Sequence, residues 1–485
     1  LFLDYALGHR FRGSPPAVFR RMSTKLEWLG WFQVFICFVI MTYYAVVVAW
    51  SLRYMFFSFS IAWGDDAGAF FQHYIGVDRL GSEVGYSPAV VMGVAVPLLL
   101  VWAFGLVVTA LGVSDGVEKA NKIFLPLLVL MFAALVVRAL IHFDLVRVYG
   151  YPYTMDGGAS LGVPIVLKPL ATNALPQRNT VKEVYEQVVK DLRKAIDDNK
   201  LYKTMTNGYI NHWTAKALLA RVYLYMGDNA NARKEAVEVI ENSPYKLWTN
   251  EEYAANVWDK TSGAHNKEML LELLNTSTDD YTDREGIAYL YNEFGYNDAI
   301  ATKSFCELLQ ADSNDVRLTA MLASRDEDMQ KKFGQDKVWI NKFPENSQGE
   351  MRLNNVPILR LSETYLIAAE ASAKLNDKAA AAKYLNAIVQ RANPKATPVS
   401  EADATVDRIL IERRKELVGE GHRFFDAMRN NQTIVRYTDE AKKGYHYTLT
   451  MPQSRKFDRT YFRIVLPIPE AETDANADIK QNPGY

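Results

Sequence analysis

Two long runs without a charged side chain most constrain what this chain can fold into. The first covers residues 28–52 and the second covers residues 84–114, which makes 25 and 31 consecutive residues. About 20 apolar residues in a helix are enough to cross a lipid bilayer. Both runs therefore predict transmembrane-type helices.

Charge density divides the chain into two parts. Residues 1–137 contain only 9 of the 55 Lys and Arg residues and 8 of the 56 Asp and Glu residues, whereas residues 138–485 hold the rest. Positive and negative charges nearly balance in both parts. This balance argues against a nucleic-acid partner, because such proteins usually present a basic patch. We expect one membrane-type domain over residues 1–137 and one water-exposed domain over residues 138–485.

A third apolar run, residues 123–137, lasts only 15 residues before Arg138. A buried helix of a soluble protein would give the same short run, but two full-length spans precede it, so we expect a membrane-type helix that is cut short. From Arg138 the pattern becomes that of an amphipathic helix, which Gly150 ends. The two patterns meet within what we expect to be a single helix.

The first part resembles the neurotransmitter:sodium symporter family. The resemblance rests on the run Pro15-Pro16-Ala17-Val18-Phe19, the pair Tyr43-Tyr44 followed by Trp50, and residues 116–140. It implies that Ile40 and Tyr44, one helical turn apart, border a substrate site in the inner membrane, although ordinary packing would also explain the two tyrosines. The family's broken first and sixth spans, which hold sodium and substrate, have no counterpart here, so we expect no isolated transport.

The second part resembles the SusD/RagB family of nutrient-binding outer-membrane lipoproteins. The resemblance rests on RALIHFDLVRVYG at 138–150, GASLGVPIV at 158–166, VPILRLSETYLIAAEA at 356–371, ERRKELVGEGHRFFD at 412–426 and QNPGY at 481–485. It implies a mainly α fold, with a tetratricopeptide-type helical scaffold and a loop-rich ligand-binding region. It also implies a lipid anchor, a place on the external face of the outer membrane, and delivery of the nutrient to a SusC-like TonB-dependent transporter.

Two helix–turn–helix patterns agree with a tetratricopeptide-type scaffold. Residues 213–244 form one pattern, in which Ala217 and Ala220 are small enough to let paired helices approach closely. Residues 361–392 form a second copy. We expect the two copies to be helical hairpins of one stack.

The tripeptide Arg138-Ala139-Leu140 fits the end of the symporter-like helix and the start of the SusD-like helix. We therefore expect a chimera of two unrelated proteins, whose SusD-like part is truncated at its N-terminus and lacks the lipid-acceptor Cys. A genuine fusion is the alternative, but it would join an inner-membrane protein to an outer-membrane one. The alternative function is that of a fragment of a sodium-coupled amino-acid symporter.

No pattern predicts an enzyme, a metal or a cofactor. The seven histidines and two cysteines lack metal-ligand spacing. Residues 158–162 match G-x-S-x-G, but Ser160 follows a Gly-rich loop, whereas a nucleophile elbow requires a strand before the serine. Interlocked charges of both signs normally serve structure, and we interpret four residues as such a network: Glu412, Arg413, Glu416 and Arg423. We expect a non-catalytic protein without a cofactor.

Residues 245–300 lack the repeat pattern and are rich in aromatic and amide side chains. Sugars present an apolar C–H face and a rim of hydroxyls, which rings and amides match. We predict that an oligosaccharide or another nutrient binds there. The candidate residues are Trp248, Trp258, Tyr281, Tyr289, Tyr291, Asn292, Phe294 and Tyr296, with Trp339 and Tyr445 as weaker candidates. A core position is an equally good explanation for any single ring.

Overall fold

The structure is a computed structural model, and it forms two compact units, Leu1–Pro126 and Leu127–Tyr485. Each unit is described by itself. The residues that the structure describes are 13–58, 67–75, 91–111, 118–167, 174–198, 200–206, 208–254, 258, 267–275, 286–291, 295–296, 299, 301–318, 322–323, 339–343, 354–440, 443 and 448–485.

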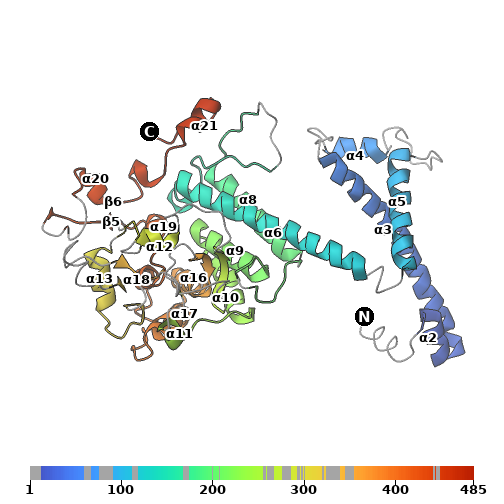
Figure 1. The fold of residues 1–485 in the computed structure, drawn as a ribbon, viewed down its shortest axis with the longest axis horizontal. Helices are drawn as coiled ribbons and strands as arrows, with labels where there is room; N and C mark the ends of the chain where they lie inside the picture. The colour runs from blue at the N-terminus through green and yellow to red at the C-terminus, as the bar shows by residue number, and fades with distance from the viewer. Residues whose placement is uncertain are drawn as a thin grey trace. The chain divides into compact units, whose positions relative to one another are not determined.

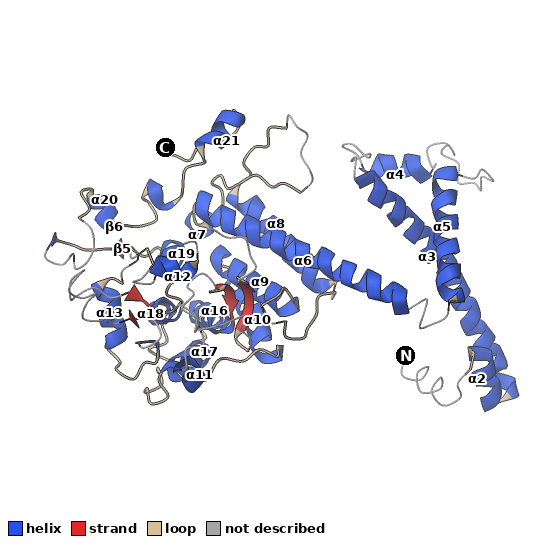
Figure 2. Ribbon diagram, in the orientation of Figure 1, coloured by secondary structure: helices blue, strands red, loops and turns tan. Residues whose placement is uncertain are grey.

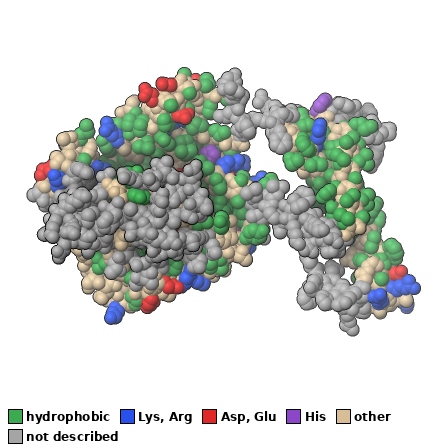
Figure 3. Space-filling model, viewed as in Figure 1, with side chains coloured by type: hydrophobic (Ala, Val, Ile, Leu, Met, Phe, Trp, Pro, Cys, Tyr) green, Lys and Arg blue, Asp and Glu red, His purple; other side chains and the backbone are tan. Residues whose placement is uncertain are grey.

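The first unit is helical. Its elements are α2 (Pro15–Met22), η1 (Thr24–Leu26), α3 (Glu27–Ser58), α4 (Ala67–Ile75) and α5 (Met92–Ala110). In the described part of the chain, one helix, Thr24–Phe57, is long and apolar enough to cross a membrane, and Met92–Val108 is a shorter apolar helix. Helix α3 covers the first predicted span, and α5 covers the middle of the second. Hydrophobic side chains occupy much of the surface of these helices (Figure 3).

Helix α5 contains a proline that changes its hydrogen bonding. Pro97 has no N–H, so the carbonyl of Gly93, one turn earlier, lacks its usual helical donor. The hydroxyl of Tyr74 in α4 donates to this carbonyl at 3.0 Å. The neighbouring helix therefore replaces the hydrogen bond that the proline removes.

Helix α6 (Glu118–Tyr149) runs without a break through the point where the sequence changes character, as the pattern predicts. Val136 and Phe143 are fully buried in the core of the second unit, whereas Ile141 is about half exposed. Arg138 donates two hydrogen bonds, of 2.5 and 2.7 Å, to Asp191 of α8 (Val181–Asp197). Arg138, the residue that follows the apolar run, thus connects α6 to α8.

The core of the second unit is a stack of helices (Figures 1 and 2). Helix α8 packs on α9, α9 on α10, α10 on α16, and α16 on both α17 and α18. The bounds are α9 (His212–Met226), α10 (Asn229–Asn242), α16 (Leu361–Lys374), α17 (Lys378–Ala392) and α18 (Val406–Glu416). The fold is mainly α, as expected.

Both predicted helical hairpins are present, as α9–α10 and α16–α17. Gly227 ends α9 in the left-handed conformation, with φ of 80°, which a glycine adopts without strain. Asp228 and Asp377 then cap α10 and α17 by accepting hydrogen bonds from backbone N–H groups. The contact of α10 with α16 brings the two hairpins together although more than 100 residues separate them.

Shorter elements surround this stack. The strand pairs are antiparallel: β1 (Met269–Leu273) with β4 (Val356–Arg360), β2 (Leu322–Ala323) with β3 (Trp339–Ile340), and β5 (Ile434–Val435) with β6 (Lys456–Phe457). In the first pair Leu273 lies opposite Val356. The short helices are α7 (Tyr153–Asp156), α11 (Asn250–Ala254), α12 (Ile287–Tyr291), α13 (Lys303–Gln310), α19 (Arg423–Arg429), α20 (Pro452–Arg455), η6 (Phe462–Ile464) and α21 (Glu470–Ala475).

The Gly-rich loop after α7 is a turn around one carboxylate. Asp156 accepts hydrogen bonds from the N–H groups of Gly158, Ala159 and Ser160 at 2.9 to 3.2 Å. No helix begins directly after Ser160, and the loop lacks the strand–turn–helix geometry of a nucleophile elbow. The local structure agrees with the prediction that this serine is part of a loop.

Candidate functional site

Three aromatic side chains from the predicted ligand region and one from further along the chain form a buried group, which we call the tryptophan cluster: Trp248, Tyr253, Trp258 and Phe343. Each is at most 5% exposed. The ring centroids of Trp248 and Trp258 lie 5.3 Å apart, and those of Trp258 and Phe343 lie 5.6 Å apart, both in edge-to-face geometry. Aromatic pairs at such distances and angles stabilise a packed core.

Burial changes the role that we assign to two predicted ligand residues. Trp248 and Trp258 leave no ring face open to solvent, because the other members of the cluster cover them. Trp339, a weaker candidate, is also fully buried. Their burial favours the core position that the sequence left open for any single ring, and a ligand contact of these three indoles stays a prediction.

Buried cations pack against the tryptophan cluster. The Lys342 Nζ lies 4.7 Å from the ring centroid of Trp258, and the guanidinium of Arg360 lies 4.9 Å from it. The guanidinium of Arg391 lies 4.4 Å from the ring centroid of Tyr253. Cations at these distances are attracted to the negative ring face, most strongly where water is excluded.

The same cations belong to a network of buried ion pairs, which we call the central ion network: Arg317, Lys342, Arg360, Arg391, Glu268, Glu412, Glu416 and Glu420. Glu416 is its centre, with contacts of 2.5 Å to Arg391 and 3.2 Å to both Arg317 and Arg360. Burial alone would raise the pKa of Glu416, but the surrounding arginines hold it well below 4.5. For Glu420, Arg360 and Lys342 overcome the effect of burial and lower the pKa to about 2.

A second group of buried charges lies beside this network. Arg413 contacts Asp426 at 2.8 Å, and Arg429 donates to both Asp426 and Glu370. The predicted structural network is thus confirmed for Glu412, Arg413 and Glu416. Arg423 differs, because its guanidinium donates to the Gln432 side chain at 2.8 Å.

Two of the predicted ligand residues have partly exposed rings and lie together, and we call them the tyrosine pair: Tyr289 and Tyr296. Helix α12 positions Tyr289, and the ring centroids lie 6.4 Å apart at an interplanar angle of 64°. Tyr296 is 46% exposed, and its backbone N–H donates a hydrogen bond of 2.8 Å to the Tyr289 carbonyl. The pair therefore offers aromatic surface where these two backbone segments are joined by a hydrogen bond.

Gly295 makes this turn possible. A Cβ at this position would lie 2.3 Å from the Tyr289 carbonyl oxygen and 2.7 Å from its Cα. Any other residue would force the two backbone segments apart. The sequence analysis did not single out Gly295, since a glycine beside aromatic residues does not reveal what it approaches.

Tyr291, a further predicted ligand residue, is partly buried against the tryptophan cluster. Its ring centroid lies 6.0 Å from that of Phe343. Burial, followed by the charge of Glu420, raises the pKa of its hydroxyl. Tyr291 thus links the tyrosine pair's helix to the central ion network. Tyr281, Asn292, Phe294 and Tyr445 lie outside the described residues.

The two residues predicted on the symporter-like substrate face lie in the first unit. Ile40 and Tyr44 project from α3 one turn apart and are 50% and 59% exposed. In the described part of the first unit, no other element covers them enough to form an enclosed site. Their role as a substrate face stays a prediction.

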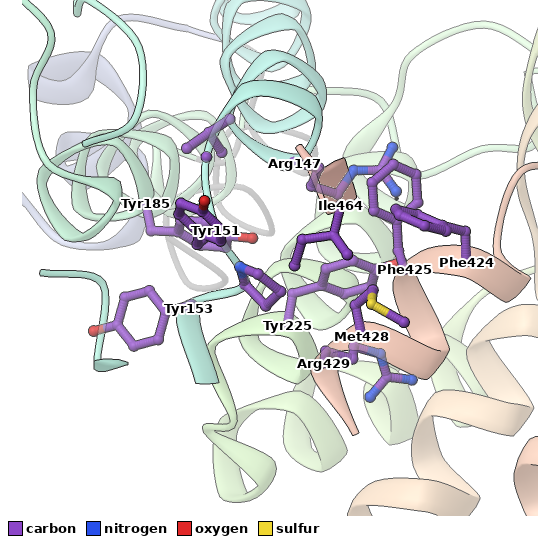
Figure 4. Close-up of a pocket in the computed structure, with 13 residues that line it drawn as sticks. Arg147, Tyr151, Tyr153, Tyr185, Tyr225, Phe424, Phe425, Met428, Arg429 and Ile464 are labelled. Carbon is purple, nitrogen blue, oxygen red and sulfur yellow. Dashed lines mark hydrogen bonds between the residues drawn. The ribbon is translucent and has the colours of Figure 1, made fainter. Parts of the chain in front are cut away.

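A second aromatic site encloses a small cavity (Figure 4). Tyr151, Tyr185, Tyr225 and Phe425 are among its walls, and its volume is about 20 Å³. That volume holds about one water molecule, whereas sites for small molecules usually occupy ~300–1,000 Å³. Arg147 also lines the cavity, and its guanidinium lies 4.6 Å from the Phe425 ring centroid. This cavity is therefore part of the packing between helices.

The described residues contain no group of three or more His, Cys, Asp or Glu side chains that could hold a metal ion. Among the described aromatic rings of residues 245–300, that of Tyr296 belongs to an exposed residue, and the tyrosine pair includes it. Rings on a rigid turn can stack against an apolar ligand face and exchange hydrogen bonds through their hydroxyls.

Three family models match parts of the chain. The model described as the SusD family matches residues 177–485. A model described as starch-binding and associating with the outer membrane matches residues 115–224. The sodium:neurotransmitter symporter family model matches residues 1–74. Both resemblances seen in the sequence are confirmed, and the SusD match covers more than half of the chain.

Solved structures resemble most of the chain. A SusD superfamily protein from Bacteroides thetaiotaomicron is 38% identical with a TM-score of 0.67, covering 79% of this chain and 85% of that one. A candidate sugar-binding protein from Bacteroides vulgatus is 41% identical with a TM-score of 0.66, covering 74% and 78%. A laminarin-binding SusD-like protein is 26% identical with a TM-score of 0.56, covering 74% and 80%.

Curated relatives match one part or the other. An uncharacterised sodium-dependent transporter of Methanocaldococcus jannaschii is 34% identical over 145 residues, which are 29% of this chain and 28% of the transporter. A SusD-like protein of Formosa agariphila is 21% identical over 345 residues, which are 62% of this chain and 66% of that protein. The chain thus spans less than a third of the transporter and about two thirds of the SusD-like relative.

Proposed function

Because the chain belongs to the SusD family, we propose that residues 138–485 bind an oligosaccharide or another nutrient without catalysing a reaction. The proposed place is the external face of the outer membrane, where a SusC-like TonB-dependent transporter would take up the bound molecule. Support for that place comes from the matching model described as starch-binding and associating with the outer membrane. Support for a sugar as ligand comes from similar proteins described as sugar-binding and laminarin-binding.

The tyrosine pair carries the proposal for the binding site. Tyr296 is 46% exposed, and its contact with Tyr289 holds both rings on one turn. An oligosaccharide would stack its C–H face on these rings, with its hydroxyls paired to nearby amides. We keep Tyr281, Asn292 and Phe294 as further proposed contacts, since they belong to the same stretch of sequence.

The buried charges give the site rigidity. The central ion network joins α17, α18 and β4 through Arg391, Glu416 and Arg360, and Arg360 also packs on Trp258 of the tryptophan cluster. A binding surface that is ordered before the ligand arrives loses less conformational entropy on binding. We infer that the indoles and the arginines act through this support.

For residues 1–137 we propose a fragment of a symporter-like membrane protein without transport activity. The support is the family match over residues 1–74 and the apolar helix Thr24–Phe57. We further propose that the chain joins two unrelated proteins near residue 137, since the two kinds of match belong to different protein families. Membrane insertion of α3 is part of this proposal.

Calorimetric titration of the whole chain in detergent micelles tests the binding proposal. Laminarin is the first probe, followed by a panel of other oligosaccharides. We expect saturable binding that Tyr296→Ala weakens by about five- to tenfold, because an aromatic contact contributes about 1 kcal/mol. Tyr209→Ala is the matched control, since Tyr209 is 64% exposed and is not part of the pair. Absence of binding across the panel, or equal weakening by both variants, would overturn the proposal.

A further inference from the structure

A groove lies between two helices of the first unit. Its volume is about 260 Å³, and residues of α3 and α5 form its walls: Leu52, Arg53, Phe56, Met92, Gly93, Val96, Pro97 and Leu100. Seven of these eight residues are apolar, and Arg53 is the single charged one. No carboxylate is among the described residues that line the groove.

The apolar wall of the groove on α5 is several helical turns long. On α5 the lining residues recur at every turn from Met92 to Leu100, which corresponds to about 12 Å along the helix axis. Gly93 contributes only backbone atoms to the lining of the groove. Val96 and Leu100 are 51% and 59% exposed, which leaves their side chains available to an apolar occupant.

Arg53 lies where a membrane interface is expected. It directly follows the charge-free residues 28–52, and its guanidinium lies over the Phe57 ring at 4.7 Å, one turn nearer to the end of α3. Arginine at the end of a membrane helix extends its charged group toward the headgroup region. The groove therefore combines a cationic group at interface depth with an apolar channel.

We propose that this groove binds an anionic lipid, with a phosphodiester headgroup at Arg53 and one acyl chain along Val96, Pro97 and Leu100. The proposal rests on the membrane insertion of α3 that is proposed above. Basic pockets between membrane helices suit anionic headgroups, because the attraction is strongest where water is excluded. An apolar helix of another protein would fill the same channel but would leave Arg53 without a counter-charge, so we favour the lipid.

Native mass spectrometry of the whole chain tests this proposal. The chain is released from micelles that contain phosphatidylglycerol or, in a parallel series, phosphatidylcholine. We expect one phosphatidylglycerol adduct to be retained in preference to phosphatidylcholine. Arg53→Gln is expected to reduce its retention about fivefold, as for one cation near an anionic surface, and Arg53→Lys is expected to restore most of it.

Two further variants separate charge from shape. Val96→Trp places an indole in the channel while Arg53 is kept, so we expect loss of the adduct. Lys25→Gln removes an exposed cation that does not line the groove, so we expect no change. Equal retention of both lipids, or equal retention in wild type and Arg53→Gln, would overturn the lipid site.

Alkaline carbonate extraction of cell membranes distinguishes failure of the proposed membrane insertion of α3 from failure of the lipid site alone. If carbonate releases the whole chain from the membrane, the insertion of α3 and the lipid site both fail. If the chain stays in the membrane but shows no preference for phosphatidylglycerol, only the lipid site fails.

Discussion

Glu416 shows how single residues hold the predicted ligand region in place. Its carboxylate is fully buried and contacts Arg317, Arg360 and Arg391. Removal of a charge from water is costly, and only close partners of opposite sign offset this cost. One of these three arginines, Arg360, also packs on the Trp258 ring. One carboxylate therefore connects the ion pairs to the aromatic cluster.

Replacement of this carboxylate should destabilise the second unit strongly. Glu416→Gln leaves three buried arginines with less compensation, so we expect a loss of about 3–5 kcal/mol in the free energy of unfolding. Chemical denaturation of the whole chain in detergent, followed by tryptophan fluorescence, measures this loss. Glu186→Gln is the control, because Glu186 lies in an exposed pair with Lys182, and we expect at most about 0.5 kcal/mol there. Equal effects of the two substitutions would contradict this account.

His422 and Glu363 predict how stability depends on pH. Burial lowers the pKa of His422 from 6.5 to about 4, and Arg221 overcomes the effect of burial on Glu363, whose pKa falls from 4.5 to about 2. Stability from His422 is therefore complete above pH 6.5 and declines as the pH falls to 4. Stability from Glu363 is complete above pH 4.5 and is lost as the pH falls toward 2.

Thermal unfolding between pH 7 and pH 4 tests the histidine part of this prediction. We expect the melting temperature to fall across this range, with a loss of at most about 3 kcal/mol from His422. His422→Gln cannot titrate, so its melting temperature should change less than that of the wild type over the same range. A parallel decline in both proteins would contradict the role of His422.

Gly295 tests whether the tyrosine pair needs its backbone turn. Gly295→Ala places a Cβ against the Tyr289 carbonyl, so we expect separation of the two rings and about tenfold weaker binding of any oligosaccharide that the wild type binds. Gly105→Ala is the control, because its Cβ would meet no atom within 4 Å. Titration calorimetry measures both variants, and unchanged affinity in Gly295→Ala would show that the turn is not needed.

At the scale of elements, the helical hairpins depend on small residues. Ala368, Ala369 and Ala371 of α16 are fully buried, and α16 packs on α10, α17 and α18. Larger side chains at these positions would push the helices apart, since a packed core has no spare volume. The alanines thus set the spacing between α16 and the helices packed on it.

An overpacking substitution tests this spacing. Ala369→Leu adds three carbon atoms to the centre of the stack, and we expect a loss of about 1–3 kcal/mol in the free energy of unfolding. Ala379→Leu is the control, because Ala379 lies on the exposed side of α17, where we expect less than about 0.5 kcal/mol. Chemical denaturation compares the two, and equal stability of both variants would contradict the close packing of α16.

The sequence predicted the elements better than the site. Spacing along a helix determines which residues share a face, so the hairpins and the Glu412–Glu416 pair were predictable. The burial of Trp248 and Trp258 was not predictable, because aromatic content alone does not distinguish a buried ring from an exposed one. Phe343, which packs on Trp258, is also distant in sequence. The approach of Gly295 to Tyr289 was also inaccessible, since it depends on a loop conformation that no periodic pattern encodes.

At the scale of the whole molecule, the two parts differ in how far their apolar side chains are exposed. In the first unit most large apolar side chains of α3 and α5 are exposed, as suits a lipid environment, whereas the second unit buries its apolar residues in a helical stack. The symporter match ends at residue 74 and the first SusD-type match begins at residue 115. Helix α6 then carries the chain into the second unit without a break.

Single-molecule sequencing of the source DNA across codons 120–160, with reads long enough to include both parts, tests the proposed chimera most directly. We predict that no single DNA molecule encodes both parts. Reads that contain the symporter-like part and reads that contain the SusD-like part would each continue into a different gene. Intact molecules that encode α3 and the SusD-like motifs in one reading frame would contradict the chimera and establish a genuine fusion.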